Sequence, residues 1–97
     1  MDYGRIASDI LTNVGGKENV KSVTHCFTRL RFVLKDESKA KKDVVEHLEG
    51  VISVVVAGGQ FQVVCGAKVT KIYDAVLPLI GDLEESASEG GNKGGFN

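Results

Sequence analysis

Two pairs of short strand-like runs, each pair interrupted by only a few residues, constrain this chain more than any other feature. The first pair is Lys21 to His25 and Thr28 to Lys35; the second is Val51 to Ala57 and Gln60 to Cys65, on either side of Gly58-Gly59. Strands joined by such short turns pair antiparallel, because a parallel crossover needs a dozen or more residues. The sequence therefore predicts two β-hairpins.

Three segments with helical periodicity alternate with these hairpins. They lie at about residues 3–14 behind Asp2 as candidate N-cap, between Asp36-Glu37-Ser38 and Gly50, and from about Ala67 until Pro78 and Gly81 end the pattern. The order α-β-β-α-β-β-α predicts an α+β fold, an α/β sandwich with a four-stranded antiparallel sheet of two hairpins and three helices on one face. The other face of the sheet is then left partly open.

The C-terminal residues differ in composition from the rest of the chain. Residues 81–97 hold five of the 12 Gly and have a net charge of −3, which is typical of a flexible linker. Residues 1–80 hold 11 basic and 9 acidic side chains, a net charge of +2. We therefore expect one domain over residues 1–80 and a Gly-rich linker over residues 81–97.

Overall charge and hydropathy argue against several classes of protein. A net charge of −1 lacks the basic surplus that nucleic-acid phosphates require, so no nucleic-acid partner is expected. The longest apolar run, Val54 to Ala57, is far shorter than the roughly 20 residues of a membrane-spanning helix. The N-terminus lacks a signal-peptide pattern, so both cysteines are expected to be reduced thiols that are available for chemistry. The domain by itself is expected to be soluble and monomeric.

One segment, His25-Cys26-Phe27-Thr28-Arg29-Leu30-Arg31-Phe32, concentrates the reactive residue types. Cys26 falls in the predicted turn of the first hairpin, where a side chain is reachable. Arg29 and Arg31 are two apart on the following strand, so both point to the open face. Nearby cations and unpaired turn N–H groups lower the pKa of a cysteine, and guanidinium groups match the oxygens of a phosphoryl group. The segment predicts an activated thiol beside two fixed cations, with the Thr28 hydroxyl as a further donor.

The second cysteine and the histidines have simpler interpretations. Cys65 alternates with Val63 and Phe61, so it is expected in the core. Neither cysteine forms, with His25 or His47, the paired short spacings of a structural zinc site. No metal is expected, and His47 is interpreted as a solvated side chain.

Two other classes of function remain open from the residues alone. In one, Cys26 is incidental, and the chain is a non-catalytic regulatory module that binds an anion or a partner through Arg29 and Arg31. In the other, Cys26 and Cys65 form a redox-switch disulfide, which requires their Cα atoms to lie within about 7 Å of each other. Thiol reactivity against pH distinguishes an activated Cys26 from an inert one.

The segment from His25 to Phe32, preceded by Asn19-Val20 and followed by Lys35-Asp36, resembles the signature of a known family. That family is the enzyme IIB domain of the bacterial sugar phosphotransferase system, in its glucose, sucrose and β-glucoside superfamily. The stretch Gly58 to Gly66 extends the resemblance, which covers residues 3–80 and is closest to the β-glucoside branch. Cys65 departs from the pattern, because this branch commonly carries an aliphatic or aromatic residue there.

The resemblance implies a two-step phosphoryl relay without a cofactor. Cys26 would accept phosphate from a phosphohistidine on a IIA domain and pass it to a sugar, expected to be a β-glucoside, that is held by a membrane-embedded IIC domain. The partners implied are thus phosphorylated IIA and sugar-loaded IIC. The linker at residues 81–97 would lead toward IIC. The expected location is the cytoplasmic face of a bacterial membrane.

The resemblance also assigns roles to individual residues by their position in the motif. Arg29 and Arg31 would neutralise the phosphoryl oxygens, and Arg29, nearer the turn, is expected to serve the onward step to sugar. Phosphate binding is expected from Thr28, from the turn at Phe27 and from Gln62. His25 would tune the thiol or shape the turn.

Overall fold

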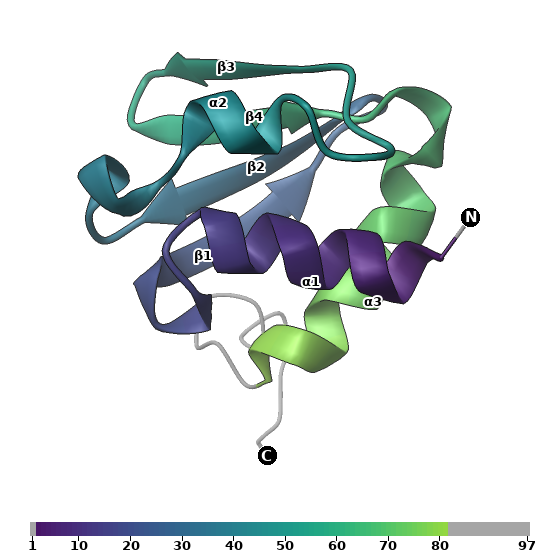
Figure 1. Cartoon of the computed structure of the whole chain (residues 1–97), viewed down its shortest axis with the longest axis horizontal. Helices are drawn as coiled ribbons and strands as arrows, with labels where there is room; N and C mark the ends of the chain where they lie inside the picture. The colour runs from purple at the N-terminus through teal and green to yellow at the C-terminus, as the bar shows by residue number, and fades with distance from the viewer. Residues whose placement is uncertain (1, 82–97) are drawn as a thin grey trace.

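The structure has the predicted order of helices and strands. A computed structural model describes residues 2–81, so the linker expected over residues 81–97 lies, apart from Gly81, outside the described residues. The elements are α1 (Tyr3–Asn13), β1 (Val20–His25), β2 (Arg29–Leu34), α2 (Lys42–Val45), β3 (Ser53–Ala57), β4 (Gln60–Val64) and α3 (Val69–Ile80). The strands form one antiparallel sheet in the order β1-β2-β4-β3 (Figure 1). The predicted α+β fold is confirmed.

The two hairpins meet through their second strands, β2 and β4. Pairing places Leu30 opposite Val63 and Phe32 opposite Phe61, and all four side chains are buried. The intervening residues of both strands lie on the other face and are only half-buried, as the two-residue period requires. One face of the sheet is therefore packed and the other partly open, as predicted.

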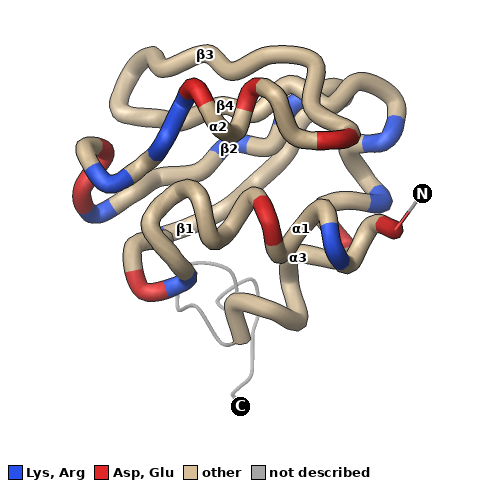
Figure 2. The backbone as a smooth tube through the Cα atoms, viewed as in Figure 1, with Lys and Arg blue, Asp and Glu red and all other residues tan. Residues whose placement is uncertain are grey.

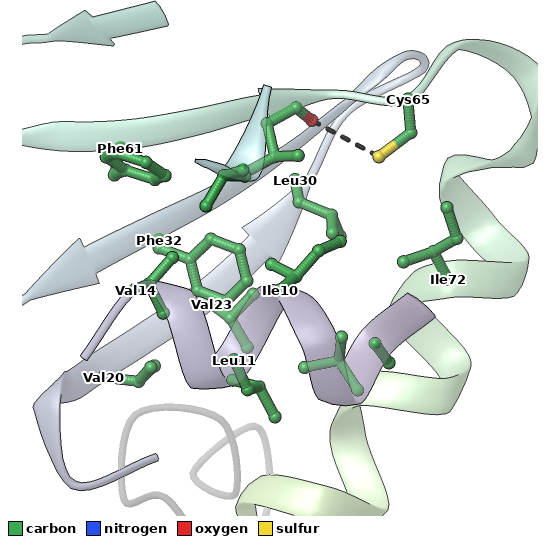
Figure 3. Packing of buried hydrophobic residues seen from close by; sticks show 14 of the residues in the cluster. Ile10, Leu11, Val14, Val20, Val23, Leu30, Phe32, Phe61, Cys65 and Ile72 are labelled. Atoms are coloured by element: carbon green, nitrogen blue, oxygen red, sulfur yellow. Dashed lines mark hydrogen bonds between the residues drawn. The ribbon is translucent and has the colours of Figure 1, made fainter. Parts of the chain in front are cut away.

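The packed face is covered by the helices. Buried residues of α1 and α3, together with Val45 of α2, form one cluster with those of the strands, and Figure 3 shows part of this packing around Phe32 and Leu30. Asp2 caps α1 as expected, because its carboxylate accepts a hydrogen bond from the Arg5 backbone N–H at 3.0 Å. Along the part of the chain that the structure describes, no helix is long and apolar enough to cross a membrane.

The second predicted helix is much shorter than its periodicity indicated. Asp36 caps a separate 3-10 turn, after which Ala40 adopts an extended conformation, and α2 spans only Lys42–Val45. The Lys41 backbone N–H donates to the Asn13 carbonyl at 2.7 Å, a tertiary bond that holds the chain at this break. This hydrogen bond to the last residue of α1 thus replaces a turn of helix, which the spacing of apolar residues alone favoured.

The last helix runs past the proline expected to end it. α3 includes Pro78 and continues to Ile80, which is buried. Pro78 lies in the final turn, where its missing N–H removes only one helical hydrogen bond. Gly81 then closes the helix with φ of 69°, and its N–H donates to the Leu77 carbonyl at 3.2 Å.

Candidate functional site

The turn between β1 and β2 carries Cys26, as the sequence predicted. The last residues paired in the hairpin are His25 and Leu30, and the Cys26 backbone N–H donates to the Arg29 carbonyl at 2.9 Å. This bond closes the hairpin around Phe27, whose side chain is 94% exposed. The Cys26 side chain is half-buried and its thiol is free.

The surroundings of Cys26 favour its thiolate form. Hydrogen bonding by the Thr28 backbone N–H lowers the pKa of the Cys26 thiol most, against an opposing effect of partial desolvation. The Arg29 backbone N–H lowers the pKa further, as do the charge and a side-chain hydrogen bond of Arg31. These are the two kinds of group, turn N–H donors and cations, that stabilise an anion on sulfur.

The two arginines both lie on the open face, but they have different partners. Arg31 interacts with the Cys26 thiol, and its Nε atom is buried without a hydrogen-bond acceptor in the described part of the chain. Arg29 donates from Nη1 to the Gln62 Oε1 at 2.8 Å. Lys21, Arg29 and Arg31 are the charged residues of the four strands, and only the two arginines lie on a central strand (Figure 2).

Gln62 and the backbone of Thr28 lie at the site and form hydrogen bonds with other residues. The Gln62 Oε1 accepts from Arg29, and its Nε2 donates to the Gln60 Oε1 at 3.1 Å. The Thr28 carbonyl accepts hydrogen bonds from the backbone N–H groups of Cys65 and Gly66 at 2.8 and 2.9 Å. The site thus includes a glutamine pair that orients Arg29 and backbone bonds that tie the turn to the end of β4.

His25 lies directly beside the thiol turn. Its Nδ1 is 2.9 Å from the Cys26 carbonyl oxygen, and its ring centroid is 4.4 Å from that of Tyr73 in α3. With Thr70 of α3, the residues His25, Cys26 and Phe27 line an open concavity of about 420 Å³. The thiol turn therefore forms one wall of a surface hollow.

Sequence reasoning missed the residues that other elements bring to this site. Tyr73 follows the apolar spacing of its helix and was expected only to pack, and Thr70 carried no signal. Gln60 was interpreted only as part of an alternating strand. The one clue to its place at the site was its spacing of two residues from Gln62, because residues two apart on a strand share a face.

Cys65 belongs to the core, as predicted. Its side chain is 3% exposed, and its Sγ donates to the Val63 carbonyl at 3.6 Å (Figure 3). Burial raises the pKa of the Cys65 thiol to about 11. The Cys26 thiol instead interacts with Arg31 on the open side, an arrangement that disfavours a disulfide between the two residues.

His47, the other histidine, lies outside the thiol turn. His47 is exposed, and its Nδ1 lies 2.7 Å from the Asp43 carbonyl oxygen in the turn around α2, away from the hairpin that carries Cys26. Within residues 2–81, no three His, Cys, Asp or Glu side chains gather in a way that would hold a metal ion.

A free thiol with a lowered pKa, in a turn that leads into a strand with two arginines, defines a class of thiol-bearing α+β domain. Comparisons with known proteins identify the family. The family model described as phosphotransferase system, EIIB, matches residues 8–40. A domain of the phosphotransferase system IIabc component from Clostridium difficile has a solved structure that is 36% identical, with a TM-score of 0.73 over 76% of this chain and 78% of that one. The chain belongs to the enzyme IIB family of the phosphotransferase system.

Curated relatives place the chain within that family. A β-glucoside-specific EIIBCA component of Halalkalibacterium halodurans is 48% identical over 89 residues, 92% of this chain and 14% of the relative. The component of the same description from Dickeya chrysanthemi is 51% identical over 81 residues, 84% of this chain and 13% of the relative. A sucrose-specific EIIBC component of Bacillus subtilis is 46% identical over 76 residues, 77% of this chain and 16% of that protein. The chain thus spans only a small fraction of the length of the curated relatives that it matches.

Proposed function

We propose that this domain is the phosphoryl carrier of a sugar-transporting phosphotransferase. Cys26 accepts a phosphoryl group from a phosphohistidine on a IIA domain and transfers it to a sugar bound by a IIC domain during uptake. The observation that carries this proposal is the environment of the Cys26 thiol, whose pKa is lowered by turn N–H groups and by Arg31. The thiolate is the nucleophile that the reaction requires, and a lowered pKa increases its fraction.

The first transfer makes a phosphocysteine. The thiolate attacks phosphorus, the S–P bond forms, and the P–N bond of the donor breaks with its electron pair remaining on the imidazole nitrogen. The Arg31 guanidinium already interacts with the Cys26 thiol, so its charge acts on the phosphoryl oxygens that form there. Transfer of this kind depends mainly on positioning and charge neutralisation.

The second transfer releases the thiolate again. A sugar hydroxyl oxygen forms the new P–O bond, its proton is released, and the S–P electron pair returns to Cys26. We assign Arg29 to this step, since the Gln62 amide holds its guanidinium in a fixed position on the open face, at 2.8 Å from Nη1. Gln62 then contributes to phosphate binding by orienting Arg29, and Thr28 and Phe27 contribute through the turn.

The composition of the relatives supports a proposal about partners and location. Relatives described as EIIBCA components combine B, C and A parts in one protein, and those of 48% and 51% identity are β-glucoside-specific. We propose that this chain works with IIA and IIC parts of the same kind, at the cytoplasmic face of a bacterial membrane. Residues 81–97 would connect it to IIC, and a β-glucoside would be the sugar.

Phosphorylation by IIA tests the proposal directly. The chain is incubated with phosphorylated IIA, and mass spectrometry at neutral pH locates the phosphate. We expect one phosphate on the Cys26 peptide, loss of acceptance by at least about 100-fold in Cys26→Ser, and normal acceptance in the matched control Cys65→Val. Phosphate on His25, or normal labelling of Cys26→Ser, would contradict the assignment.

A further inference from the structure

The turn that carries Cys26 has no apolar anchor of its own. Phe27, at its tip, is 94% exposed, so packing of this side chain does not fix the turn. The thiol nevertheless depends on the orientation of two backbone N–H groups, those of Thr28 and Arg29. Because each N–H is fixed in the plane of its peptide unit, the carbonyl groups of the turn decide where these donors point. The contacts of those carbonyl groups therefore matter for the acidity of the thiol.

One of those carbonyl groups is held by β4. The Thr28 carbonyl accepts from the N–H groups of Cys65 and Gly66 at 2.8 and 2.9 Å. Thr28 C=O and the Arg29 N–H belong to the same peptide unit, so these two bonds orient that N–H. Only main-chain atoms take part, and no side chain is needed on this side of the turn.

A second carbonyl group of the turn, that of Cys26, is held by a side chain. His25 Nδ1 lies 2.9 Å from the Cys26 oxygen, and because a carbonyl only accepts, the imidazole must carry its proton on Nδ1 to make this bond. Tyr73 contacts the same imidazole, with centroids 4.4 Å apart and planes at 53°. This tilted geometry is a favourable one for two aromatic rings, and it limits rotation of an otherwise exposed histidine.

We infer that His25, supported by the ring of Tyr73, is a positioning residue for the Cys26 thiol. The imidazole fixes the Cys26–Phe27 peptide unit, while β4 fixes the Thr28–Arg29 unit with its Arg29 N–H. The Phe27–Thr28 unit between them is thereby held from both sides, so that the Thr28 N–H stays directed at the sulfur. This inference deepens the proposed function, because it concerns the thiol that accepts the phosphate. α3 thereby influences the reactivity of a residue on the first hairpin.

Three uncharged replacements of His25 test the presence and the position of its hydrogen-bond donor. In His25→Asn the amide Nδ2 occupies the place of Nδ1, at the same number of bonds from Cβ, and has no charge. In His25→Gln the amide nitrogen lies one bond further out, and in His25→Ala there is no donor. The readout is the pH midpoint of iodoacetamide alkylation of the Cys26 peptide, followed by mass spectrometry.

We expect the midpoint to rise by about 0.5–1 pH unit in His25→Ala and His25→Gln and to stay within about 0.3 unit of the parent in His25→Asn. Tyr73→Leu is expected to raise it by about 0.3–0.5 unit, and Tyr73→Phe, which keeps the ring, by less. An unchanged midpoint in His25→Ala, equal midpoints for the Asn and Gln variants, or equal effects of the two Tyr73 variants would overturn the inference. Because alkylation needs no IIA, the expected midpoints would support the inference even if the parent chain took no phosphate from IIA.

Discussion

Cys26 and Cys65 lie at the same end of the sheet, one in the β1–β2 turn and the other directly after β4. A backbone hydrogen bond links the two regions, because the Cys65 N–H donates to the carbonyl of Thr28, two residues after Cys26, at 2.8 Å. Their thiols nevertheless have pKa values displaced in opposite directions, downward for Cys26 and upward to about 11 for Cys65. The comparison shows that the immediate donors and the face of the sheet, rather than the residue type, decide which cysteine is reactive.

The physical causes on the two sides are distinct. Cys26 is surrounded by N–H donors and by the Arg31 guanidinium, which stabilise a negative charge on sulfur. Cys65 packs in an apolar cluster, where its Sγ donates a hydrogen bond to the Val63 carbonyl, and such surroundings penalise the anion. Three predictions test this contrast, from the largest expected effect to the smallest.

The largest effect is expected in the relative alkylation rates of the two thiols in the folded protein. At pH 7 iodoacetamide should modify Cys26 at least about 100-fold faster than Cys65, because the latter is buried and has a far smaller thiolate fraction. Peptide mass spectrometry of a time course measures both rates. In denaturant the rates should converge, and similar rates in the native protein would contradict the contrast.

A smaller effect is expected in the pH dependence of stability. The pKa of Cys65 is raised in the folded state, so its contribution is complete below the ordinary value of 9.0 and is lost as pH rises toward about 11. The free energy of unfolding should fall by about 2 kcal/mol over this range relative to Cys65→Val. Cys26 contributes with the opposite sign, because its pKa is lowered: its stabilisation is present at high pH and disappears as pH falls.

Urea unfolding of the parent and of Cys65→Val at a series of pH values between 8 and 11 measures the difference. Lysines and tyrosines also titrate in this range, but they do so in both proteins, so their contributions to the free energy of unfolding cancel in the difference. A constant difference across this range would mean that burial does not penalise the Cys65 thiolate.

The smallest effect is expected from a matched pair of arginine variants. Arg31→Gln removes the charge beside the thiol, so the Cys26 pKa should rise and its alkylation rate at pH 7 should fall about fivefold. Arg29→Gln keeps the backbone N–H that acts on the sulfur, and it should change the rate by less than about twofold. Alkylation kinetics of the Cys26 peptide measure both, and equal effects would show that the thiol responds only to the net charge of the face.

The sequence predicted the site best where the pattern was local. Cys26 in a turn, with Arg29 and Arg31 on one face, required only the short hairpin and the two-residue strand period. The second predicted helix was mostly wrong, because the bond from the Lys41 N–H to the Asn13 carbonyl and the extended Ala40 override the apolar spacing. Tertiary contacts of this kind cannot be recognised from the spacing of apolar residues.

What the sequence determined by itself is the set of elements, the order α-β-β-α-β-β-α and the residues of the thiol turn, because short turns and side-chain periods act over a few residues. Only the tertiary structure decided that β2 lies beside β4 and that α3 reaches β1. The first contact brings the Gln62 amide to Arg29, 33 residues away, and the second brings Tyr73 to His25. Contacts between distant segments depend on which sheet edges and helix faces meet, and packing of the whole core sets that choice.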